Sequence, residues 1–108
     1  MNKGALLMNL YKEIPPSQIA AEKAYFVSAI FKLLPYKQDG YEHLDNYFDS
    51  VLQRLIGFNK IFGFQPEVIT IMSLLEYARG ESDYKKYRKA VLDACGLVEF
   101  IRESDTHD

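Results

Sequence analysis

Residues 41–80, YEHLDNYFDSVLQRLIGFNKIFGFQPEVITIMSLLEYARG, decide the fold because they have the pattern of two helices joined by a very short turn. In the first half, apolar residues recur at the spacing of one continuous helical stripe: Leu44, Phe48, Val51, Leu55, Phe58 and Phe62. Gly63 ends this helix, since glycine accepts the positive φ angle common after a helix. Pro66 begins the next helix, where its missing N–H costs nothing. Helices with so short a connection lie antiparallel, so the stretch predicts a helical hairpin.

The first 40 residues predict two further helices. A short one over residues 4–13 is indicated by apolar residues at roughly helical spacing: Leu6, Leu7, Leu10 and Ile14. A longer one runs from Ser17, which can cap it, to Pro35, which closes it. Its apolar stripe is wide, because Val27, Phe31 and Leu34 lie beside the row Ile19, Lys23, Phe26, Ile30 and Leu33. We expect this helix to be the most buried one.

A last helix follows Ser82 and Asp83, which can cap its start. Its apolar stripe is Tyr84, Tyr87, Val91, Cys95 and Val98. Gly96 costs about 1 kcal/mol relative to alanine in a helix, so we expect a bend or break there. The last five or so residues are polar and are expected to be disordered. The sequence thus predicts an all-α fold: a single domain over residues 1–108, built as an antiparallel four-helix bundle with a short extra N-terminal helix.

Composition narrows the classes of function. The chain has 108 residues, 26% of them charged, and a formal net charge of −2, so no general attraction to nucleic acid is expected. Cys95 is the only cysteine, which excludes an internal disulfide and a cysteine zinc site and suits a reducing compartment. No stretch approaches the ~20 apolar residues that cross a bilayer, and the N-terminal apolar run is too short for a signal peptide. We expect a soluble, cytoplasmic protein.

Residues suited to catalysis are scarce. His43 lies near the start of a helix, beside Glu42 and Asp45, and a phosphotransfer histidine needs such an exposed imidazole. The lysine and glycine that usually follow that histidine at helical spacing are absent, so a solvated surface histidine is the favoured interpretation. Cys95 falls on an apolar stripe with no visible base, which favours a structural role. The sequence therefore predicts no catalytic residue and a protein that is not an enzyme.

Three carboxylates, Glu42, Asp45 and Asp49, share one face of the first hairpin helix. Metal sites in helical bundles use inward-facing Glu residues with Glu-x-x-His pairs, and no such pair occurs in this chain. The face lies opposite the apolar stripe and should point to water. We expect no metal site and no cofactor.

The densest basic and aromatic cluster is the run Tyr84-Lys85-Lys86-Tyr87-Arg88-Lys89. On a helix its lysines can line the outer face while Tyr84 and Tyr87 turn inward. Such a surface suits an acidic protein or lipid headgroups, although a merely solvated helix face has the same pattern. Tyr36, Tyr41 and Tyr47 near one end of the hairpin form a second candidate interface, because exposed tyrosines suit protein contacts.

The chain resembles the immunity proteins of pediocin-like (class IIa) bacteriocins. The resemblance runs from about Leu44 to Ile101 and rests on packing and turn patterns. These are the Phe48–Val51–Leu55 stripe, the turn Phe62-Gly63-Phe64-Gln65-Pro66-Glu67, the helix end Leu74-Leu75-Glu76-Tyr77-Ala78-Arg79, and the charged helix that follows. It implies a cytoplasmic, non-enzymatic four-helix bundle that protects its host from a secreted peptide toxin.

In that family the protein acts at the inner face of the membrane, on the mannose phosphotransferase permease with its bound bacteriocin, and the C-terminal half tends to decide which toxin is recognised. The resemblance therefore places the partner-binding residues of this chain at Lys85, Lys86, Arg88, Lys89, Phe100 and Arg102. It implies peripheral membrane contact and a monomer or weak dimer. Many members are basic, whereas this chain is mildly acidic.

Two alternatives stay open at the level of sequence. One is a small helical adaptor or regulatory protein that works by protein–protein binding, as a homodimer through an exposed hairpin face. The other is histidine phosphotransfer through His43.

Overall fold

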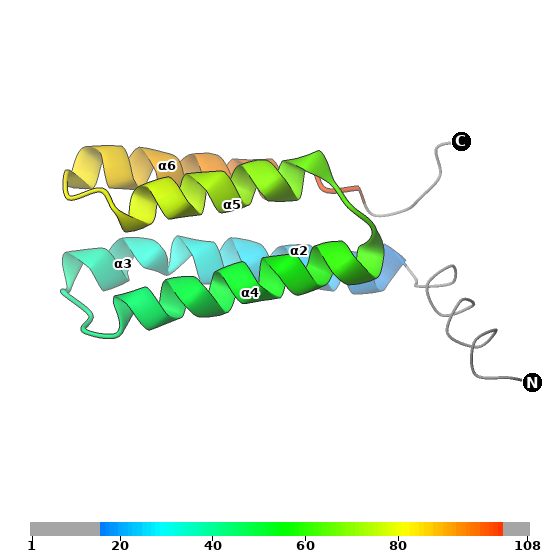
Figure 1. Cartoon of the computed structure of the whole chain (residues 1–108), viewed down its shortest axis with the longest axis horizontal. Coiled ribbons are helices and arrows are strands. Elements are labelled where there is room, and N and C mark those ends of the chain that lie inside the picture. The colour runs from blue at the N-terminus through cyan, green and yellow to red at the C-terminus, as the bar shows by residue number, and fades with distance from the viewer. Residues whose placement is uncertain (1–15, 103–108) are drawn as a thin grey trace, which may run out of the picture.

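The computed structural model describes residues 16–102, which are all-α, with five helices and no β-strand in that range. The helices α2 (Pro16–Phe31) and α3 (Leu33–Gln38) follow one another almost in line, and α4 (Leu44–Phe62), α5 (Pro66–Arg79) and α6 (Tyr84–Val98) each reverse the direction of the chain (Figure 1). The helix expected over residues 4–13 and the disorder expected at the C-terminal end lie outside the described residues.

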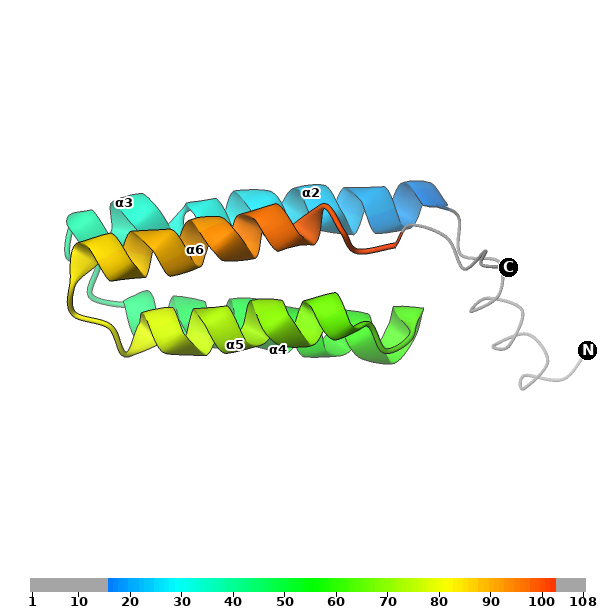
Figure 2. The same cartoon turned by 90° about the horizontal axis from the view of Figure 1, so that it is seen from above.

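The helices lie in two layers, with α2, α3 and α6 in one and α4 and α5 in the other (Figures 1 and 2). Each long helix is a neighbour of two others, and α5 packs most extensively against α6. The space between the layers is filled by aliphatic and aromatic side chains from every helix. The largest fully buried ones are Tyr87, Phe26, Phe48, Ile30, Leu33, Leu55, Ile71, Leu75, Ile101, Val51, Val68 and Val91.

The hairpin predicted over residues 41–80 is confirmed. Its first helix ends at Phe62, and Gly63 follows with a φ of 94°, a backbone conformation that a side chain would strain. Pro66 is the first residue of α5, and Gly80 follows its last residue, Arg79. The predicted stripe of α4 faces the core, where Phe48, Val51, Leu55 and Phe58 are buried. The turn residues and the apolar periodicity both indicate a helical hairpin, which explains why residues 41–80 were predictable.

Two predicted helix boundaries are wrong. Pro35 does not close its helix: the interruption comes earlier, at Lys32, and the chain continues as α3 with Pro35 in its first turn. A first-turn residue needs no intrahelical acceptor for its N–H, so proline fits there without the loss that it causes further inside. Ser17 is not the cap of α2, because that helix already begins at Pro16.

The break expected at Gly96 does not occur, since α6 continues through it to Val98. Packing of α6 against both α2 and α5 offsets the small cost of one helical glycine.

Burial does not extend across the whole wide stripe of α2. Phe26 and Ile30 are fully buried, but Val27 is 38% exposed and Phe31 is 54% exposed. Among the helices that the structure describes, α4 and α6 pack along α2, and they cover one side of its wide stripe. The remaining side faces outward.

Candidate interaction surface

The four basic residues of α6 are all exposed, and they point to different sides of the helix. Tyr87, in their midst, is fully buried and its hydroxyl donates a 2.8 Å hydrogen bond to the Leu33 carbonyl oxygen. This bond fixes the rotation of α6, so the predicted inward turn of Tyr87 is confirmed. Its burial raises the pKa of the Tyr87 hydroxyl, which therefore remains a neutral donor at physiological pH.

Lys86 and Lys89 lie on the side of α6 that faces α5. They line a shallow hollow of about 150 Å³ together with Leu74, Tyr77, Ala90 and Asp93. Lys89 donates a 2.8 Å hydrogen bond to Asp93, which raises the pKa of its ammonium group. The hollow thus has an apolar floor and a charged rim, and one of the two rim cations is already paired.

Arg88 lies on the opposite edge of α6, next to α2. It precedes Cys95 by two helical turns, which places both on one side of the helix, and the Cys95 thiol lies 3.9 Å from the Val27 carbonyl oxygen of α2. Within residues 16–102, neither Arg88 nor Lys85 has an ion-pair partner. Lys86 likewise has no ion-pair partner in this range, so Lys85, Lys86 and Arg88 are the cations of the cluster with charge available for a partner.

Phe100 and Arg102 lie at the other end of α6 from the basic cluster. Phe100 is 67% exposed, whereas the Arg102 backbone is held: its N–H donates to Gln65 Oε1 at 3.0 Å and its carbonyl accepts from Gln65 Nε2 at 3.5 Å. Lys23 adds hydrogen bonds to the carbonyl oxygens of Glu99 and Ile101. With a rise of about 1.5 Å per residue, α6 separates the two groups by about 15 Å or more. The structure therefore does not bring the six sequence-predicted residues together in one site.

His43 and Cys95 lie in different environments. His43 is exposed and directly precedes α4, with its Nε2 3.2 Å from a Glu42 oxygen and its ring against Tyr41. Cys95 is half-buried, and burial raises the pKa of its thiol, which opposes the thiolate form that a nucleophile needs.

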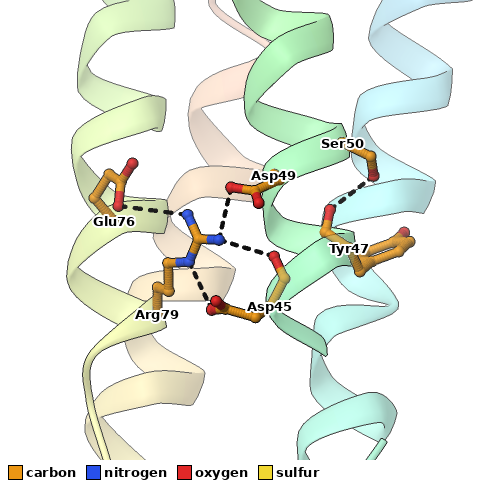
Figure 3. Close-up of polar contacts among 6 residues, drawn as sticks. All are labelled: Asp45, Tyr47, Asp49, Ser50, Glu76 and Arg79. Carbon is orange, nitrogen blue, oxygen red and sulfur yellow. Dashed lines mark hydrogen bonds and ion pairs between the residues drawn. The ribbon is translucent and has the colours of Figure 1, made fainter. Parts of the chain in front are cut away.

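The carboxylate face of α4 has a role that the sequence did not reveal. Arg79, at the end of α5, donates to Asp45 Oδ1 at 2.8 Å, to the Asp45 carbonyl oxygen at 2.9 Å and to Asp49 Oδ1 at 2.7 Å, and Glu76 lies 3.9 Å away (Figure 3). The hydrogen bonds that Arg79 donates to Asp45 and to Asp49, the former being the larger effect, raise the pKa of its guanidinium group above its usual range. The cluster fastens α5 to α4.

Within residues 16–102, no group of three or more His, Cys, Asp or Glu side chains is arranged to hold a metal ion. Asp49 and Arg79 are 30 positions apart and lie on different helices, so the spacing of carboxylates along α4 could not have indicated their ion pair.

The tyrosines at the α3–α4 corner do gather. The ring centroid of Tyr36 lies 4.6 Å from that of Tyr41 and 5.0 Å from that of Tyr47. Tyr47 also donates a 2.6 Å hydrogen bond to the Ala29 carbonyl oxygen of α2 (its own carbonyl accepts from Ser50, Figure 3), and burial raises its pKa to about 12. Much of this aromatic cluster therefore joins α3, α4 and α2 rather than facing a partner.

Comparison with protein-family models, with curated proteins and with solved structures finds no match for this chain. Among the helices that the structure describes, none is long and apolar enough to span a bilayer.

Proposed function

We propose that this chain is an antiparallel four-helix bundle that acts as an immunity protein of the pediocin-like bacteriocin class. It binds, from the cytoplasmic side, the mannose phosphotransferase permease while that receptor holds the toxin, and it protects the cell without catalysing a reaction. The partner-binding residues in this proposal are those of α6 and the segment after it: Lys85, Lys86, Arg88, Lys89, Phe100 and Arg102.

The observation that carries the proposal is the combination of an all-helical fold over residues 16–102 with four exposed bases on its last helix. Exposed bases on a rigid helix suit recognition of an acidic protein surface, and basic side chains are attracted to an anionic membrane. The two groups at the ends of α6 favour an extended contact along the helix over a single pocket, because Phe100 and the basic cluster are too far apart to touch one side chain.

A protection assay tests this proposal. The chain is expressed in a bacteriocin-sensitive Gram-positive strain, which is then challenged with a panel of pediocin-like peptides. We expect the inhibitory concentration of one or a few peptides to rise by about ten-fold or more, equivalent to at least one decade of effective affinity. An unchanged inhibitory concentration for every peptide, with the folded protein present in the cells, would contradict the immunity function.

Charge reversal of Lys85, Lys86 and Lys89 to glutamate should abolish protection while leaving the helical circular dichroism unchanged. The matched control is Lys60→Glu, which reverses an exposed lysine on α4. Protection that survives the triple reversal would remove the basic cluster from the proposal.

A second candidate, a helical adaptor that binds another protein or a second copy of itself, is favoured by the exposed apolar side of α2. Phe31 at 54% exposure is a large apolar side chain on the outside of a regular helix. A molar mass that rises with protein concentration in light scattering would support self-association.

A further inference from the structure

Helix α2 carries two apolar rows, and the structure covers only one of them. The inner row, Ile19, Phe26, Ile30 and Leu33 with the start of α3, is buried. The outer row is Ala20, Ala24, Val27 and Phe31, of which Ala24, Val27 and Phe31 are exposed. Its spacing of four, three and four residues is the one by which a helix packs lengthwise against another helix. We call this outer row the α2 seam.

Helix α6 extends the seam on one side. The contact between Cys95 and the Val27 carbonyl and the bond between Tyr87 and the Leu33 carbonyl fix an antiparallel register of α6 against α2 and α3. In this register Phe31 lies level with the α6 turn between Arg88 and Leu92. Leu92 and Cys95 are partly buried, so they add apolar surface beside Val27 and Phe31.

The layer that holds the seam is basic. Residues 16–38 and α6 together contain seven lysines and arginines against two acids, Glu22 and Asp93. Both acids are already paired, with Arg54 and Lys89 respectively. The other layer, α4 and α5, carries three bases and four acids. The seam therefore lies in a field that attracts negative charge.

We propose that the α2 seam is the docking surface for an amphipathic, acidic helix of a partner protein. The apolar side of that helix packs on Val27, Phe31 and Leu92, and its carboxylates meet Arg88. This surface lies on the α2 edge of α6, away from the hollow that Lys86 and Lys89 line, and it does not depend on the immunity function.

The small residues of α2 favour a helix over a bilayer as the occupant. Ala21, Ala24 and Ser28 are exposed on the same helix, and small residues let a second helix backbone approach closely. Insertion into a bilayer instead needs several large side chains that protrude, and of the two large seam residues Phe31 is more than half exposed whereas Val27 is 38% exposed. The first fifteen residues of the chain carry two lysines and one glutamate, so they do not supply the acidic charge that the layer attracts.

The probe is a fluorescein-labelled, helix-forming peptide of about 18 residues with leucine at coiled-coil spacing and glutamate at the remaining exposed positions. The control peptide has the same sequence with lysine in place of every glutamate. Binding to the full-length chain is measured by fluorescence anisotropy. We expect the glutamate peptide to bind about ten-fold or more tightly than the lysine peptide, because only the former complements the basic layer.

The variants Phe31→Asp and Ala24→Glu should each weaken binding of the glutamate peptide by about ten-fold or more. Both positions are exposed, so both variants should fold, which circular dichroism and thermal unfolding check. The matched control is Ile69→Asp on α5, at 40% exposure, which should change binding by less than about two-fold.

Three results would overturn the proposal. The first is equal binding of the two peptides, or binding that Phe31→Asp and Ala24→Glu leave unchanged. The second is an absence of peptide binding together with sedimentation on phosphatidylcholine–phosphatidylglycerol vesicles that Phe31→Asp abolishes, which would assign the seam to a membrane. The third is a dimer in light scattering that Phe31→Asp dissociates, which would assign it to a second copy.

Discussion

Helices α2 and α4 lie side by side and both carry apolar residues at helical spacing, yet their environments differ. The stripe of α4 is narrow, and the core takes up nearly all of it: Phe48, Val51, Leu55 and Phe58 are buried. The stripe of α2 is wide, and its outer edge, with Val27 and Phe31, faces solvent. The width of a stripe thus reports how much surface a helix offers for burial, whereas the number of neighbouring helices decides how much of it is buried.

In this comparison of α2 with α4, the largest effect on stability is expected from a substitution at the centre of α4. Leu55 is fully buried, so Leu55→Ala removes its side-chain contacts and leaves a cavity. We expect the free energy of unfolding to fall by about 2–5 kcal/mol. Urea denaturation followed by circular dichroism measures it. A loss below that of an ordinary surface substitution would mean that the α4 stripe is less well packed than described.

A pH titration tests the bond by which α4 holds α2. Tyr47 and Tyr87 both have raised pKa values, Tyr47 at about 12, with burial as the main cause. A raised folded-state pKa adds stability that is fully present below the unfolded value of about 10 and is lost as the pH rises through the folded value. We expect the protein to lose stability between about pH 10 and pH 12.

The variant Tyr47→Phe should reduce this alkaline loss, because it removes one of the two tyrosine hydroxyls whose pKa burial raises. Absorbance at the tyrosinate band and circular dichroism, recorded together, separate ionisation from unfolding. Ionisation of all tyrosines near pH 10, with no lag behind the exposed ones, would contradict the buried environment of Tyr47.

The ion-pair cluster of Figure 3 joins α4 to α5 outside the apolar core, in addition to the packing of the α4 stripe. Replacing Arg79 with methionine keeps most of the aliphatic packing and removes its bonds to Asp45 and Asp49. These carboxylates are exposed, so we expect a loss of about 1 kcal/mol or less at low ionic strength. The difference from the unsubstituted protein should shrink in molar salt, which screens exposed pairs. Arg54→Met, which breaks one pair with Glu22, is the control.

The smallest effect is expected at the α2 seam. Phe31→Ala removes a side chain that is 54% exposed, and the free energy of unfolding should change by about 0.5 kcal/mol or less. The measurement is the same urea denaturation. A loss as large as that of Leu55→Ala would break the comparison, because it would show that Phe31 is packed within the fold rather than available to a partner.

The sequence predicted the parts of the fold that local rules determine. Gly63 and Pro66 mark a turn whatever surrounds them, and the α4 stripe needs a core on one side only. The errors arose where a choice depends on neighbours. Pro35 is compatible both with a helix end and with a first turn, and the interruption at Lys32 selects the second. Gly96 is tolerated because α6 packs on two helices.

The candidate site was predictable only as a composition. The run of bases on α6 was visible in the sequence, but the different environments of these bases were not. Lys89 pairs with Asp93, Lys86 faces α5, and Arg88 faces α2. Arg79 could not be matched with Asp45 and Asp49 from spacing, because the pair joins two helices. The exposure of Phe31 could not be predicted, since a wide stripe does not say which of its edges is covered.

The buried Gln65 side chain has a consequence for amide hydrogen exchange. Both ends of its amide group bond to the Arg102 backbone, so the turn between α4 and α5 holds the segment that follows α6. The Arg102 N–H is thereby shielded by a contact 37 positions away in the sequence. It should exchange with solvent as slowly as an amide inside a helix, and Gln65→Ala should release it first. We therefore expect residues 99–102 to open together with the hairpin turn.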